Sequence, residues 1–117
     1  MGGSPGAPGS PGPPYHEKRE VPRYSFIAEV ALIEPATNTR IAGRVSEISR
    51  KGCYVDVLNT LPEGTAIDLQ VSRDRGVFGT RGKIIYVQPG MGMGVAFIDV
   101  PEDQMKVLDA WLQELSS

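Results

Sequence analysis

The chain has 117 residues, of which 40% are hydrophobic, and a formal net charge of −2. This is enough for one domain and too little for two. The chain contains no run of about 18 apolar residues, so we predict no membrane-spanning helix. The single cysteine and single histidine argue against an internal disulfide, a Cys/His metal site and a Ser-His-Asp triad. We therefore predict no enzyme and no metal site, and the lone cysteine favours the reducing cytoplasm.

The first 16 residues differ in composition from the rest of the chain. Twelve of them are Gly, Pro or Ser, and such a segment cannot bury enough apolar surface to offset the entropy lost on ordering. We predict a disordered Gly/Pro-rich tether over residues 1–16 and one packed domain over residues 17–117. The tether lacks the basic start and apolar stretch of a secretory signal.

Alternation of apolar and polar residues identifies the first two predicted strands. Residues 24–33 follow a period of two, and one face is formed by Tyr24, Phe26, Ala28, Val30 and Leu32. Residues 40–46 follow after a turn, and their alternation breaks because the next aliphatic residue is Ile48. This break predicts a β-bulge or a strand end.

Four more short strands follow, separated by turns rich in Gly, Pro and Asp, over residues 53–57, 65–72, 77–88 and 93–99. Six strands without a crossover helix predict an antiparallel sheet, and closure into a small barrel removes its exposed edges. Cys53 alternates with valines and is predicted to be a small core residue. The predicted fold class is all-β, a six-stranded antiparallel barrel with one C-terminal helix.

That helix is predicted over the last seventeen residues, where the period changes to 3.6 residues per turn. The apolar positions with this spacing are Met105, Leu108, Trp111, Leu112 and Leu115. Pro101 and the two acidic residues after it suit a helix N-terminus. Because Trp111 follows this spacing, we predict that it packs into the end of the barrel and does not bind a ligand.

Two segments contain candidate binding residues. Arg19 and Arg23 are four residues apart, but Pro22 disfavours a helix between them. In an extended segment, two guanidinium groups can reach around a phosphate or guanine ligand. The second segment, Glu47–Gly52, has Ser49 and Gly52 where a strand passes into a turn that exposes backbone N–H groups. Taken singly, the spacing of the first favours a solvated basic junction over a binding site, and the second favours an ordinary hairpin turn.

Together these segments resemble the PilZ domain family, which are bacterial receptors for cyclic di-GMP. The family pattern is RxxxR before the barrel and (D/N)xSxxG after the second strand. Here the two motifs are Arg19–Arg23, preceded by Lys18, and Glu47–Gly52. Tyr24, which follows the arginine pair, and the glycine that opens Gly94–Phe97 also fit the family.

The resemblance covers about residues 17–115 and implies a PilZ-like split barrel whose rim and N-terminal arm bind cyclic di-GMP, without cofactor or metal. It assigns ligand binding to Lys18, Arg19, Arg23, Glu47, Ser49 and Gly52. The arginines would contact phosphates and guanine edges, and the residue at position 47 would accept hydrogen bonds from guanine. It also implies that ligand binding changes the arm and the surface seen by a protein partner in motility, pilus or exopolysaccharide control.

One residue departs from the family pattern. Glu47 stands where Asp or Asn is usual, and its extra methylene moves the carboxylate by about 1.5 Å, whereas recognition geometry tolerates about 0.5 Å. Its carboxylate either relaxes to the same ligand contact or pairs with Arg19, Arg23 or Arg44 and occupies the site. The alternative function is therefore a PilZ-type adaptor that binds no nucleotide. A third alternative, an RNA-binding barrel, is disfavoured by the few aromatic residues and the negative net charge.

Overall fold

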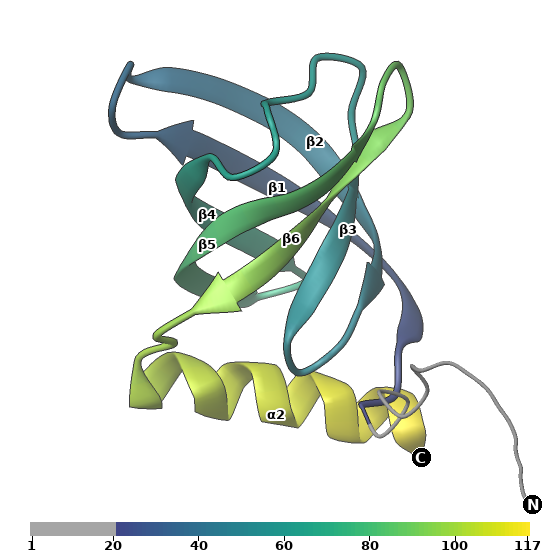
Figure 1. Cartoon of the computed structure of the whole chain (residues 1–117). Coiled ribbons are helices and arrows are strands. Elements are labelled where there is room, and N and C mark those ends of the chain that lie inside the picture. The colour runs from purple at the N-terminus through teal and green to yellow at the C-terminus, as the bar shows by residue number, and fades with distance from the viewer. Residues whose placement is uncertain (1–20) are drawn as a thin grey trace, which may run out of the picture.

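The computed structural model describes residues 21–117, which form a barrel with one helix across an end (Figure 1). Its elements are β1 (Tyr24–Glu34), β2 (Thr39–Ile48), β3 (Gly52–Asp56), β4 (Ala66–Arg73), β5 (Gly76–Gln88), β6 (Gly92–Ile98) and α2 (Glu102–Ser116). The predicted fold class is confirmed. The predicted tether, residues 1–16, lies outside the described residues.

The strands close into a barrel in the order β1-β2-β3-β6-β5-β4, and every neighbouring pair is antiparallel. The long strand β1 closes the ring because it pairs with both β2 and β4, so that Val30 lies between Gly43 and Val71. Closure gives each of these six strands a neighbour on both sides, which shortens the exposed sheet edges.

The barrel interior is filled by every second residue of the strands. The predicted inward face of β1 is confirmed for Phe26, Ala28, Val30 and Leu32, all of which are buried. The fully buried side chains include Phe78, Leu32, Ile48, Ile67, Ile84, Met93, Leu108 and Val55. The core is therefore built from all six strands and the helix, as the alternation and the 3.6-residue period predict.

The predicted bulge in β2 is present. Val45 and Ile48 are both fully buried although they are three residues apart, which strict alternation does not allow. The register of β2 against β3 shifts between Val45 and Glu47. One inserted residue therefore returns Ile48 to the core and leaves Ser46 and Glu47 on the outer side.

Another bulge occurs in β5, which the sequence predicts as one strand over residues 77–88. The register against β6 shifts between Ile84 and Tyr86. Ile84 is fully buried, whereas Ile85 and Tyr86 are exposed. The extra residue thus turns two consecutive side chains outward, close to the outward-facing part of β2 described below.

Helix α2 covers one end of the barrel (Figure 1). Leu108 and Trp111 are buried, and the Trp111 ring lies 5.4 Å from that of Phe26 and 6.3 Å from that of Phe78, centroid to centroid. The prediction that Trp111 packs into the barrel is therefore confirmed. Within the described part of the chain, no helix is long and apolar enough to span a membrane.

Cys53 offers a direct test of this packing, because it is the single cysteine. It is buried in the core, and burial raises the pKa of its thiol to about 12. Since the thiolate is the reactive form, we expect native Cys53 to react with a thiol reagent at pH 8 about a hundredfold more slowly than in the urea-unfolded chain. Equal labelling rates in the two states would contradict the burial of this strand.

Candidate functional site

A pocket of about 330 Å³ opens on the outside of the barrel, beside the turn between β2 and β3. It brings together four of the six predicted site residues: Arg23, Glu47, Ser49 and Gly52. The other two, Lys18 and Arg19, lie outside the described residues. The pocket walls also include Ile48, Lys51, Cys53, Tyr54, Ile85, Tyr86, Gly94, Val95 and Ala96.

The turn that forms one wall is organised by Ser49. Its backbone N–H donates to the carbonyl oxygen of Gly52 at 2.8 Å. Its hydroxyl oxygen accepts hydrogen bonds from the backbone N–H groups of Lys51 at 3.1 Å and Gly52 at 3.2 Å. The side chain is buried. Ser49 therefore shapes the site by fixing the turn, as a serine commonly does through local side chain–backbone bonds.

Gly52 allows a close approach between two strands. It pairs with Ala96 of β6, and a Cβ at this position would overlap the carbonyl oxygen of Val95. Gly52 does not have a positive φ, because the described glycines with positive φ are Gly64 and Gly90. The glycine is thus explained by backbone contact across the sheet.

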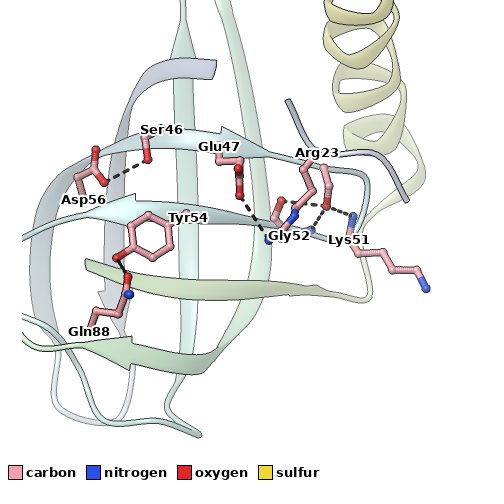
Figure 2. Close-up of polar contacts among 9 residues, drawn as sticks. Arg23, Ser46, Glu47, Lys51, Gly52, Tyr54, Asp56 and Gln88 are labelled. Carbon is pink, nitrogen blue, oxygen red and sulfur yellow. Dashed lines mark hydrogen bonds and ion pairs between the residues drawn. The ribbon is translucent and has the colours of Figure 1, made fainter. Parts of the chain in front are cut away.

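Arg23 and Glu47 face each other at this pocket. Arg23 is the residue directly before β1 in the chain. Nη1 of its guanidinium is 3.4 Å from Oε1 of Glu47. Figure 2 marks this contact between the two side chains with a dashed line, beside the turn that contains Lys51. The bulge in β2 makes this possible because it turns Glu47 outward. Of the pairings considered from the sequence, the structure forms the one with Arg23, while Arg44 pairs with Asp56 at 3.4 Å. The third candidate, Arg19, lies outside the described residues.

An aromatic surface forms another wall of the pocket. Tyr54 of β3 and Tyr86 of β5 both pair with Gly94 of β6, and their ring centroids are 6.1 Å apart. A Cβ on Gly94 would overlap the Tyr86 ring, so the missing side chain lets this ring lie against the strand. Ile85, also exposed, extends the apolar surface. Such a surface suits a planar, apolar face of a ligand.

The Tyr54 hydroxyl donates a hydrogen bond to Oε1 of Gln88 (Figure 2). Burial raises the pKa of Tyr54, and the nearby Tyr86 and Asp56 raise it further. The phenol therefore stays protonated at neutral pH and remains a donor. This bond fixes the orientation of one ring of the aromatic surface.

The pocket carries both signs of charge. Two cationic side chains, Arg23 and Lys51, and one anionic side chain, Glu47, are part of its lining. Among residues 21–117, Lys51 is in no ion pair. In the same part of the chain, no group of three His, Cys, Asp or Glu residues is placed to hold a metal ion. The arrangement can therefore hold an anionic ligand with a flat ring system.

Sequence reasoning missed Lys51, Tyr54, Ile85 and Tyr86 as members of this site. One signal was available, because Tyr54 is an outward-facing aromatic on a strand next to a glycine-rich strand. Ile85 and Tyr86 gave no such signal, since only the bulge in β5 turns both of them outward.

The wall of the pocket is also tied to the helix. Arg50, in the turn between β2 and β3, places its Nε 3.2 Å from Oδ1 of Asp109 in α2. Both side chains are about half exposed, so the ion pair contributes little stability by itself. It nevertheless joins the turn that borders the site to the last element of the chain.

Comparisons with known proteins agree with this architecture. A search of curated proteins gave no match. Among solved structures, the PilZ domain of YcgR from Escherichia coli with cyclic di-GMP has a TM-score of 0.69 at 18% identity, covering 86% of this chain and 92% of that one. The PilZ domain of CeSA from a cellulose synthesizing bacterium has a TM-score of 0.64 at 17% identity, covering 82% and 99%.

The inhibitor of motility MotI/DgrA from Bacillus subtilis has a TM-score of 0.67 at 15% identity, covering 87% of this chain and 56% of that one. At these identities the solved structures support the fold alone. The family assignment comes from the sequence, because the model of the PilZ domain matches residues 17–114. Since this match includes both motifs and the whole barrel, the chain belongs to the PilZ domain family.

Proposed function

We propose that this PilZ domain is a receptor module that binds cyclic di-GMP in the pocket beside the β2–β3 turn. The observation that carries the proposal is the convergence of Arg23, Glu47 and the Ser49–Gly52 turn on one pocket. These are the described parts of the two family motifs. Support also comes from the similar PilZ domain of YcgR, whose structure contains cyclic di-GMP.

The chemistry of the pocket matches that of the ligand. Cyclic di-GMP has two negatively charged phosphates and two flat guanine bases. Arg23 and Lys51 offer cationic donors for the phosphates, and a guanidinium fork also fits the O6/N7 edge of guanine. The exposed ring of Tyr86 offers a stacking surface for a base. Lys18 and Arg19 complete the proposed set of ligand contacts on the N-terminal arm.

Ligand binding would become a signal through the arm and the turn. In this proposal, residues 17–23 close over the ligand, and the surface around them changes for a protein partner. The resemblance in fold to an inhibitor of motility suggests a motility protein as one such partner. We propose that the module acts in the cytoplasm and performs no catalysis.

The first test is a calorimetric titration of cyclic di-GMP into the purified chain, with GTP as the control nucleotide. We expect saturable binding with a dissociation constant of about 1 μM or tighter, a free energy of about −8 kcal/mol, and no binding of GTP. An absence of both heat and amide shifts in NMR spectra at high ligand concentration would contradict the proposal. That result would instead favour the adaptor that binds no nucleotide.

A further inference from the structure

The ion pair between Arg23 and Glu47 has a consequence for affinity. We infer that Glu47 is an internal competitor of the ligand, whose carboxylate holds the Arg23 guanidinium and thereby weakens the binding of anionic ligands at this pocket. The length of the side chain at position 47 then sets the concentration range over which the receptor responds. This inference rests on the proposed function for its biological meaning, but the competition itself can be tested with a simple anion.

The backbone geometry brings the two side chains together. Ser25 of β1 pairs with Glu47 of β2, so Arg23, two residues before Ser25, lies close to the start of this ladder. Without the bulge in β2, strict alternation would point Glu47 into the barrel. The bulge turns it into the pocket, where its Oε1 is 3.4 Å from Nη1 of Arg23.

The same guanidinium cannot fully serve both partners. A phosphate needs the N–H groups of Arg23 that face the pocket, and the Glu47 carboxylate competes for them. Lys51, the other cation of the described lining, has no acidic partner among residues 21–117. Within residues 21–117, the competition therefore acts at Arg23 and not at Lys51.

Side-chain length decides whether the pair forms. Aspartate at position 47 would place its carboxylate about 1.5 Å nearer the backbone and would move it beyond ion-pair distance from Arg23. Glutamine would keep the length and remove the charge. The two substitutions thus weaken the same pair by different means, and aspartate does so without changing the net charge of the chain.

The expected effect is modest because the pair is open to solvent. The side chains of Arg23 and Glu47 are 65% and 44% exposed, and exposed ion pairs are weak. We expect Glu47→Gln and Glu47→Asp each to tighten anion binding by about two- to fivefold. Glu47 thus attenuates binding without blocking it.

The experiment uses two probes, cyclic di-GMP and inorganic pyrophosphate, which carries phosphate charge and no base. Affinities of the native chain, Glu47→Gln and Glu47→Asp are measured by calorimetry and, for weak binding, by NMR shift titration. Glu63→Gln is the matched control, because Glu63 is exposed and lies outside the pocket lining. It removes the same charge and should leave both affinities unchanged.

A double substitution separates competition from general repulsion. In the Arg23→Ala background, Glu47→Gln should give no gain in pyrophosphate affinity, because the guanidinium that it releases is absent. The inference is overturned if the gain persists without Arg23, or if neither substitution at position 47 tightens binding of either probe. The proposed function is judged separately, by whether the native chain binds cyclic di-GMP. A gain for pyrophosphate alone would support the inference and count against the nucleotide.

Discussion

Arg23→Ala is expected to lower the affinity for cyclic di-GMP by about a hundredfold or more. A hydrogen bond to a charged partner contributes about 1.5–3 kcal/mol, and an arginine that forks onto a phosphate or a guanine edge makes two of them. Among the described residues that line the pocket, the cations are Arg23 and Lys51. Lys51 cannot replace Arg23, because an ammonium group does not form the two parallel hydrogen bonds of a guanidinium. Calorimetric titration of the variant measures the loss directly.

The variant should remain folded, because the Arg23 side chain is 65% exposed and takes no part in the core. Thermal unfolding of the variant checks this. Arg75→Ala is the matched control, since Arg75 is an exposed arginine in the turn between β4 and β5, away from the pocket. Native affinity in Arg23→Ala, or an equal loss in Arg75→Ala, would contradict the proposed site.

Gly52→Ala is expected to destabilise the barrel by about 3 kcal/mol. The added methyl group would overlap the carbonyl oxygen of Val95, and Val95 is itself buried in the core. Relief requires β3 and β6 to separate, which weakens the ladder between them. Urea unfolding followed by Trp111 fluorescence measures the change, because Trp111 is the single tryptophan and lies on the buried face of α2.

Gly79→Ala gives the matched comparison. Gly79 also lies within a strand, but a Cβ there would meet its nearest atom, the carbonyl oxygen of Leu69, at 3.8 Å. This is ordinary contact, so we expect a change within about 0.5 kcal/mol. Equal stability of Gly52→Ala and Gly79→Ala would show that the approach of β3 to β6 is looser than in the structure.

Much of the barrel could be predicted from the sequence because its signals are local. The alternation in residues 24–33 identifies the inward face of β1, and the break before Ile48 predicts the bulge in β2. Both signals concern neighbours a few residues apart, whose side chains point to opposite faces of one strand. The bulge in β5 left no comparable trace, because Ile84, Ile85 and Tyr86 are all apolar or aromatic and either Ile84 or Ile85 could have faced inward.

The candidate site was predictable only in part. The spacing of its motifs indicated the family and named Arg23, Glu47, Ser49 and Gly52, which the structure brings to one pocket. The assignment of these residues to a ligand stays a prediction. The sequence placed Ser49 where a strand passes into a turn, and only the structure shows its hydroxyl oxygen accepting hydrogen bonds within that turn.

The sequence by itself determined the strand pattern, the closing helix and the family, since these depend on periodicity and on the spacing of a few residues. Only the tertiary structure decided which partner Glu47 takes and which aromatic rings border the pocket. Arg23 lies 24 positions before Glu47 along the chain, and Tyr54 and Tyr86 come from strands on either side of β6. Such contacts depend on strand order, register and bulges, which are fixed when the whole barrel closes around its core.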